Sequence, residues 1–185
     1  SMEVPSIDPE IDIDLELYTG PPPREWQIRA LEAWIQAGET GIVEAVTGTG
    51  KTLVGILAAA RAVRRGERVV ICVPTLVLLR QWVEKLNEFL TNVLVGELHG
   101  TQKDRIDDVD ILVATVQSAL IYVTIHERKS TMLIADEVHG LGAPIRKGIL
   151  DENYTSKLGL TATLERDNDE GVEDYIVPYF VSTVF

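Results

Sequence analysis

The stretch Ala45-Val46-Thr47-Gly48-Thr49-Gly50-Lys51-Thr52 is the part of the chain from which the rest can be interpreted. It follows a short apolar run at 41–44 and precedes a strongly helical run at 53–65, so a glycine-rich turn joins a strand to a helix. This order is typical of a phosphate-binding loop, in which glycines let backbone N–H groups turn toward a phosphate and the helix points its positive end at the same place. The sequence therefore predicts a site for the phosphates of a nucleotide.

The side chains of this loop have predicted roles toward ATP and Mg²⁺. Lys51 is placed to reach the β- and γ-phosphates, and the hydroxyl of Thr52 is placed to bind Mg²⁺. The rest of the predicted phosphate cradle is Thr47, Gly48, Thr49 and Gly50. The pattern G-x-x-x-x-G-K-[ST] has a glycine where this chain has Ala45. The alternative is an ordinary Gly/Thr turn, which we disfavour because the segments on both sides agree with a phosphate loop.

Two adjacent acidic residues follow another apolar run. Asp136 and Glu137 come directly after the run at 131–135. Neighbouring carboxylates at a strand end are costly to hold together unless a cation lies with them, and Mg²⁺ is that cation. We expect Asp136 to hold the metal, directly or through water, and Glu137 to orient and deprotonate the water that attacks the γ-phosphate. With Lys51 they form the predicted catalytic set, and the alternative is a solvated acidic turn.

Four further polar residues are candidates for the same site. Gln27 stands near the start of a helical segment at 24–37, and a Gln amide pairs bidentately with N6 and N7 of adenine. Gln27 is therefore a candidate adenine reader, or a surface glutamine if it acts alone. His139, Thr161 and Thr163 are candidates for relaying the state of the nucleotide. The alternatives are a structural histidine and the ordinary preference of threonine for strands.

Strand-like apolar runs alternate with helical segments along the chain. Helices are expected at 24–37, at 53–65 and along the face that runs from 79 to 90. Strands are expected at 41–44, 68–73, 93–98, 110–116, 131–135, 157–160 and 179–185, with a polar loop at 101–110. This alternation predicts an α/β domain with a mostly parallel sheet, in which ligands bind beyond the carboxyl ends of the strands.

The chain is expected to divide at Gly20-Pro21-Pro22-Pro23. Residues 1–20 form an acidic arm, in which 11–17 alternates apolar and acidic residues as an edge strand does, and residues 21–185 form the main domain. Half of the net charge of −12 lies in the arm, because residues 3–16 contain six acidic residues and no Lys or Arg. The negative charge argues against a generic nucleic-acid-coating protein but allows a local basic track.

Composition and cysteine usage narrow the class of protein. A chain of 185 residues with 45% hydrophobic and 25% charged residues is expected to form one globular domain with its own core. No apolar run approaches the roughly 20 residues of a membrane span, and no signal-peptide pattern opens the chain. The single cysteine, Cys72, excludes an intrachain disulfide and a cysteine-based zinc site, and it fits a buried thiol in a reducing cytoplasm. We expect an intracellular monomer that contacts no membrane.

Taken together, these residues resemble the first RecA-like lobe of a superfamily 2 helicase of the DExH type. Helicase-type motors commonly open the phosphate loop with alanine, as this chain does at Ala45. The matches keep the order of the family over residues 20–185: Gln27 for motif Q, 45–52 for motif I, 74–80 for motif Ia, 99–100 for motif Ib, 115–118 for the next motif that contacts the nucleic-acid strand, 136–139 for motif II and 161–163 for motif III. Within the superfamily, residues 135–140 together with residues 158–167 look closest to the XPB-like DNA repair and transcription helicases. Their Arg-Glu-Asp signature is replaced here by Glu165-Arg166-Asp167.

The resemblance implies a three-layer RecA-like P-loop fold and Mg²⁺-dependent ATP hydrolysis coupled to movement on, or opening of, DNA. It implies a second RecA-like lobe of the same parent chain that supplies arginine fingers, so the lobe alone is expected to hydrolyse ATP slowly. DNA is expected across the strand-end face, held through its phosphates without sequence readout. The residues implied in this contact are Thr75, Arg80, Gly100, Thr115, Gln117 and Ser118. Two alternatives stay open: an RNA-directed superfamily 2 motor, and a P-loop nucleotide switch or scaffold that binds a protein partner.

Overall fold

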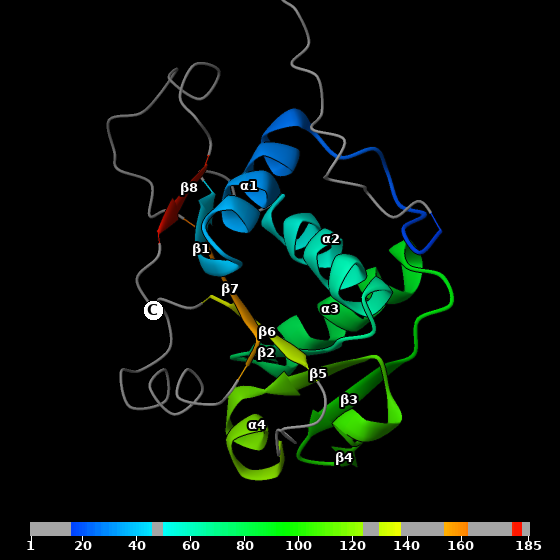
Figure 1. Ribbon diagram of the computed structural model, residues 1–185. Helices are drawn as coiled ribbons and strands as arrows, with labels where there is room; N and C mark the ends of the chain where they lie inside the picture. Colours follow the sequence, from blue (N-terminus) through cyan, green and yellow to red (C-terminus); the bar gives the residue numbers. More distant parts are fainter. Residues whose placement is uncertain (1–15, 46–49, 124–129, 138–153, 163–178, 183–185) are drawn as a thin grey trace, which may run out of the picture.

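The fold is built on one central β-sheet (Figure 1). A computed structural model of the protein describes residues 16–45, 50–123, 130–137, 154–162 and 179–182. Within these residues the sheet has eight strands in the order β4-β3-β5-β2-β6-β7-β1-β8. The strands are β1 Thr40–Ala45, β2 Arg68–Val73, β3 Val95–His99, β4 Gln102–Lys103, β5 Ile111–Thr115, β6 Thr131–Asp136, β7 Ser156–Ala162 and β8 Tyr179–Ser182.

The strands from β3 to β1 in this order are all parallel to one another, and β4 and β8 pair antiparallel at the two edges. The inner strands are continuous apolar runs because both of their faces are covered. Every residue of β6 is buried, and every residue of β2 after Arg68 is buried. The prediction of an α/β domain with a mostly parallel sheet is therefore confirmed.

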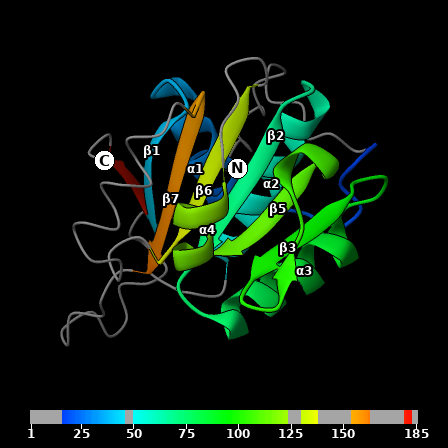
Figure 2. The ribbon, with the colours of Figure 1, turned by 90° about the horizontal axis from the view of Figure 1, so that it is seen from below.

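Helices cover the two faces of the sheet unequally (Figure 2). The helices α1 Glu25–Gln36, α2 Lys51–Arg64 and α3 Leu76–Phe89 pack with Ile71 and Met132 into the larger apolar core. The short helix α4 Val116–Tyr122 and the 3₁₀ turn η1 Ile106–Asp108 pack with Cys72 on the opposite face. Successive residues of a strand point to opposite faces, so Ile71 and Cys72 reach different cores.

The helix ends follow the expected chemistry. Gly38 and Gly66 each follow the C-cap of a helix, with φ of 84° and 82°, a left-handed conformation that glycine adopts without a steric penalty. No helix in the described part of the chain is long and apolar enough to cross a membrane. Burial raises the pKa of the Cys72 thiol to about 12, which agrees with the expected core cysteine.

Three segments differ from the expectations. The strand expected at 110–116 ends at Thr115, and Val116–Tyr122 forms α4, a helix of seven residues that is too short for its apolar period to stand out. The loop expected at 101–110 contains β4 and η1. Of the segment expected to form an edge strand at 11–17, residues 11–15 lie outside the described residues. Tyr18, just beyond it, is buried in the larger core and bridges to Leu90.

Candidate functional site

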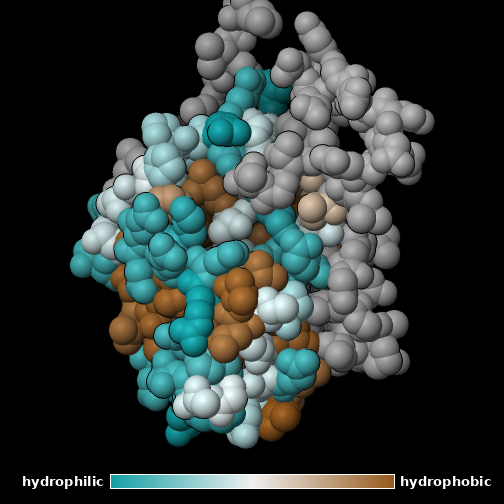
Figure 3. Space-filling view, turned by 180° about the vertical axis from the view of Figure 1, so that it is seen from behind, coloured by the Kyte–Doolittle hydropathy of each residue, from teal (hydrophilic) through white to brown (hydrophobic). Residues whose placement is uncertain are grey.

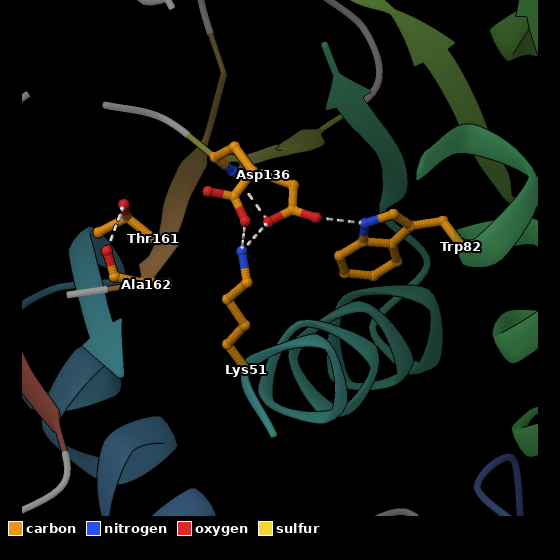
Figure 4. Close-up of polar contacts among 6 residues, drawn as sticks. Lys51, Trp82, Asp136, Thr161 and Ala162 are labelled. Carbon is orange, nitrogen blue, oxygen red and sulfur yellow. Dashed lines mark hydrogen bonds and ion pairs between the residues drawn. The ribbon is translucent and has the colours of Figure 1, made fainter. Parts of the chain in front are cut away.

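Lys51, at the start of α2, and the two acidic residues at the end of β6 come together at the carboxyl ends of the strands. The first residue of α2, Lys51, lies beside the last residue of β6, Asp136, with Nζ 2.8 Å from Oδ1 (Figure 4). The same ammonium group donates to Oε1 of Glu137. Both predicted carboxylates therefore meet the predicted phosphate-binding lysine at one point.

This cluster is held away from water. Lys51 is 5% exposed and Asp136 is 2% exposed. A buried charge is costly unless it is paired and hydrogen-bonded, and here the ammonium has two carboxylates as partners. The alternative of a solvated acidic turn is thus wrong for Asp136, while the side chain of Glu137 keeps partial access to solvent.

Both oxygens of the Asp136 carboxylate are fixed by hydrogen bonds. Oδ1 accepts from Nζ of Lys51 and, at 2.9 Å, from the backbone N–H of Glu137. Oδ2 accepts from Nε1 of Trp82 at 2.8 Å. All three donors suit an ionised carboxylate, which can only accept. The orientation of this side chain is consequently set before any ligand binds.

Glu137 has an unusual backbone conformation. Its φ is 53°, in the left-handed region that residues other than glycine seldom occupy. Such conformations cost on the order of 1–3 kcal/mol and cluster at functional sites. Glu137 adopts this conformation directly after the last residue of β6, while its carboxylate contacts Lys51.

Gln27 joins the start of α1 to the phosphate loop. Its Nε2 donates to the carbonyl oxygen of Gly50 at 2.9 Å, and its Oε1 accepts from the backbone N–H of Arg24 at 2.8 Å. The residue is buried, so the alternative of a surface glutamine is wrong. Its role as an adenine reader stays a prediction. The ring of Trp26 packs against Gly50, because a Cβ added at Gly50 would lie 2.3 Å from Cζ2 of this ring.

Two predicted threonines lie on neighbouring elements. Thr52 follows Lys51 on α2, and Thr161 is the second-last residue of β7. Thr52 lies in the first turn of α2 and is partly exposed. Thr161 is buried, and its hydroxyl donates to the carbonyl oxygen of Ala162 at 3.4 Å (Figure 4). The predicted residues that lie outside the described part of the chain are Thr47, Gly48, Thr49, His139 and Thr163.

The donor set of this cluster fits Mg²⁺ only together with a phosphate. Among the described residues no group of three or more His, Cys, Asp or Glu side chains is arranged to hold a metal. Mg²⁺ is usually bound by one or two protein oxygens, with phosphate oxygens and waters completing an octahedron. The Asp136 carboxylate and the Thr52 hydroxyl are oxygen donors of that kind, at the strand end and in the adjacent first turn of α2.

Sequence reasoning missed the contact of Trp82 with Asp136. The sequence places Trp82 only on the apolar face of the helix expected at 79–90. The signal that points further is chemical, because a buried indole N–H needs an acceptor. Which acceptor it finds depends on how α3 packs on α2, and no local pattern reveals that.

Comparisons with known proteins assign the family. Residues 21–166 match the family described as type III restriction enzyme, res subunit. The chain belongs to this family. The chain is 32% identical over 156 residues to DNA 3'-5' helicase XPB of Mycobacterium tuberculosis, covering 77% of this chain and 28% of that protein. It is 33% identical over 153 residues to DNA 3'-5' translocase XPB2 of Sulfurisphaera tokodaii, covering 78% of this chain and 31% of that protein. The chain thus spans less than a third of these curated relatives.

Solved structures of other proteins share the fold of this chain. The UvsW helicase from bacteriophage T4 superposes with a TM-score of 0.66 at 21% identity, over 90% of this chain and 62% of that one. The Sulfolobus solfataricus SWI2/SNF2 ATPase core in complex with dsDNA gives 0.66 at 22% identity, over 90% and 36%. The fold is therefore that of a RecA-like helicase domain, and the expected resemblance to XPB-type superfamily 2 helicases is confirmed.

The residues expected to contact nucleic acid lie along one edge of the sheet. Three neighbouring strands, β3, β5 and β2, end at His99, Thr115 and Val73, just before or at the predicted positions. Thr75 caps α3 by accepting from the N–H of Leu78, and it is exposed. The exposed members of the predicted set are Thr75, Arg80, Gly100 and Gln117, whereas Thr115 is half-buried and Ser118 is buried.

Apolar side chains are also exposed on the described surface. Seen from behind, that surface carries apolar patches among polar ones (Figure 3). Leu76 and Val77, in the first turn of α3, are 39% and 66% exposed. The start of α3 therefore exposes both polar and apolar groups: the guanidinium of Arg80, the hydroxyl-bearing cap residue Thr75, and the side chains of Leu76 and Val77.

Proposed function

We propose that this chain is the ATP-binding lobe of an ATP-dependent DNA helicase or translocase. In this proposal, Mg²⁺-dependent hydrolysis of ATP is coupled to movement on DNA or to its opening. The observation that carries the proposal is the contact of the buried pair Lys51 and Asp136 with the partly exposed Glu137, at the carboxyl edge of a parallel sheet and at the end of a glycine-rich sequence. Membership of the family, and the similarity to the XPB helicase and the XPB2 translocase, support the same function.

The roles of the residues follow from their positions. Lys51 would exchange its carboxylate partners for oxygens of the β- and γ-phosphates. Thr52 and Asp136 would hold Mg²⁺, which supplies positive charge to the phosphates when bound. Glu137, half open to solvent, would accept the proton of the attacking water. His139, Thr161 and Thr163 would sense the γ-phosphate beside them.

The adenine base would be read at Gln27. An amide oxygen has two lone pairs and an amide nitrogen has two hydrogens. The hydrogen bonds to Arg24 and Gly50 use one of each, which leaves capacity for N6 and N7 of adenine. Thr47, Gly48 and Thr49 would complete the phosphate cradle ahead of Gly50. The proposed nucleotide site thereby extends from the start of α1 to the end of β6.

A second RecA-like lobe would complete the site. The curated relatives are more than three times as long as the segment they share with this chain, which leaves room for such a lobe on the same polypeptide. Arginine fingers are worth roughly 10³–10⁵ in rate, so residues 21–185 alone would turn over ATP slowly. We also propose that the protein works inside the cell, as a monomer, on DNA laid across the edge that carries Thr75 and Arg80.

Polynucleotide-stimulated ATP hydrolysis by the full-length protein tests this function. Single-stranded DNA, duplex DNA and single-stranded RNA are added in separate assays, with Lys51→Ala as the blank. The matched control is Lys85→Ala, an exposed lysine on α3 whose nearest acid is Glu88. Stimulation by DNA that is lost only in the blank is the expected result. Stimulation by RNA alone would replace DNA with RNA as the track, and hydrolysis indifferent to every polymer would favour a nucleotide switch.

A further inference from the structure

Trp82 connects helix α3 to the proposed metal-binding carboxylate. Its indole Nε1 donates to Oδ2 of Asp136 at 2.8 Å, across 54 positions of sequence. Trp82 is 1% exposed, so water does not compete for this contact. A hydrogen bond from a buried donor to an ionised acceptor is stronger than one between neutral groups. The contact therefore has the strength to hold a carboxylate in one orientation.

The indole is itself held in place by the elements around it. A Cβ added at Gly55 on α2 would lie 2.6 Å from Cη2 of Trp82 and 3.1 Å from Cδ1 of Leu160 on β7. Glycine at this position lets the ring lie directly against the backbone of α2, between that helix and the sheet. With its ring fixed on one side, Trp82 has little freedom to turn away from Asp136.

The two carboxylate oxygens of Asp136 accept hydrogen bonds from different side chains. Oδ2 is engaged by Trp82, and Oδ1 faces Lys51 at the end of the phosphate loop (Figure 4). Without the indole N–H, the carboxylate could rotate, and Oδ2 would be a buried acceptor without its donor. We infer that Trp82 is a positioning residue that holds the Asp136 carboxylate in the orientation in which it would bind Mg²⁺. This inference rests on the proposed function of the site.

The variant Trp82→Phe tests the inference, because it keeps an aromatic ring and removes the N–H. The chain offers a matched control in Trp34, which is also 1% exposed and donates from Nε1 to the backbone oxygen of Lys157 at 2.9 Å. Trp34→Phe removes the same atoms and one hydrogen bond, but that hydrogen bond does not involve Asp136. Both variants are first compared with the parent chain by thermal unfolding, to establish that they fold.

The first readout is the Mg²⁺ concentration that gives half-maximal binding of a fluorescent ATP analogue. It should rise about tenfold in Trp82→Phe, as expected for loss of one hydrogen bond to a charged group, and stay unchanged in Trp34→Phe. Nucleotide binding measured in EDTA should be equal in all three proteins. An unchanged Mg²⁺ requirement in Trp82→Phe would overturn the inference alone. Absence of Mg²⁺-dependent binding in the parent chain would instead overturn the proposed function.

The second readout needs neither nucleotide nor metal. The chain has three tryptophans, so its NMR spectrum should contain three indole N–H signals. The signal that disappears in Trp82→Phe should be the one displaced most by Asp136→Asn, which weakens the acceptor while keeping its shape. If Asp136→Asn leaves that signal in place, Trp82 does not hold the carboxylate and the inference is wrong.

Discussion

The Nζ atom of Lys51 lies 2.8 Å from Oδ1 of Asp136, and 85 positions of sequence separate the two residues. The contact forms because parallel strands bring their carboxyl ends to one edge, with β7 alone between β1 and β6. A second carboxylate, that of Glu137, shares the same ammonium group. One buried cation thus balances two acids, of which Asp136 is buried and Glu137 is partly exposed.

Removing that cation should destabilise the domain. In Lys51→Ala, Asp136 and Glu137 would be neighbouring carboxylates without the partner they share, and breaking a buried pair on one side costs about 3–5 kcal/mol. Urea unfolding followed by far-UV circular dichroism measures the loss. Lys85→Ala serves as the control, because its side chain is half exposed and its nearest acid lies 3.8 Å away. A free energy of unfolding equal to that of the parent chain would show that the pair contributes nothing to the fold.

Gly50 should not tolerate even one added methyl group. In Gly50→Ala the new Cβ would lie 2.3 Å from Cζ2 of Trp26 and 3.0 Å from Nε2 of Gln27. Overpacking of this kind costs about 1–3 kcal/mol, and it would displace the amide that donates to the Gly50 carbonyl. Thermal unfolding and ATP titration should both show the effect.

The control for this prediction is Gly100→Ala, where an added Cβ meets no atom within 4 Å. Adding Trp26→Leu to Gly50→Ala should restore part of the stability, because it removes the ring that the methyl group meets. If the double variant is no more stable than Gly50→Ala, the clash with Trp26 is not the cause.

Much of this site was predictable from sequence, for a physical reason. Residues that follow apolar strands in a parallel sheet are bound to meet at one edge, so Lys51, Asp136 and the segments after β2 and β5 could be grouped without a structure. The contact between Trp82 and Asp136 could not be foreseen, because it depends on how closely α3 approaches α2 at Gly55. Local patterns also failed to indicate that Tyr18 packs into the core, since it lies between the alternating segment at 11–17 and the Gly-Pro run at 20–23, outside any expected helix or strand.

Arg80 should contribute to DNA affinity through charge. It is exposed on α3, close after the Thr75 cap. Arg80→Ala should weaken binding of duplexes of any sequence and should lower the slope of log K against log salt by about 1, as expected for one phosphate contact. Fluorescence anisotropy at several salt concentrations measures both quantities. Arg29→Ala, an exposed arginine on α1 that pairs with Glu25, is the matched control.

The triple variant Thr75→Ala, Arg80→Ala and Thr115→Ala extends this test to the whole edge. It should bind DNA more weakly than Arg80→Ala alone. Unchanged affinity in the triple variant would mean that the nucleic acid lies on another face.

Cys72 should be inert in the folded protein. Burial raises the pKa of its thiol to about 12, from an ordinary value of 9.0, so the reactive thiolate is scarce at pH 8. Iodoacetamide should leave the folded chain unlabelled and should modify it rapidly in urea, as mass spectrometry would reveal. The raised pKa also means that folding favours the protonated thiol. Its contribution to stability is therefore complete below about pH 9 and is lost as the pH rises toward 12. Labelling of the folded chain at the rate of the unfolded chain would contradict this burial.

Titration of the chain with ATP, in Mg²⁺ and in EDTA, tests the central claim most directly. We predict saturable binding that is tighter in Mg²⁺, lost in Lys51→Ala and retained in Lys85→Ala, because in the proposed site Lys51 would hold the phosphates and Asp136 would hold the metal. Binding of equal strength in Lys51→Ala, with the variant folded, would contradict it and would move the nucleotide away from the ends of β1 and β6.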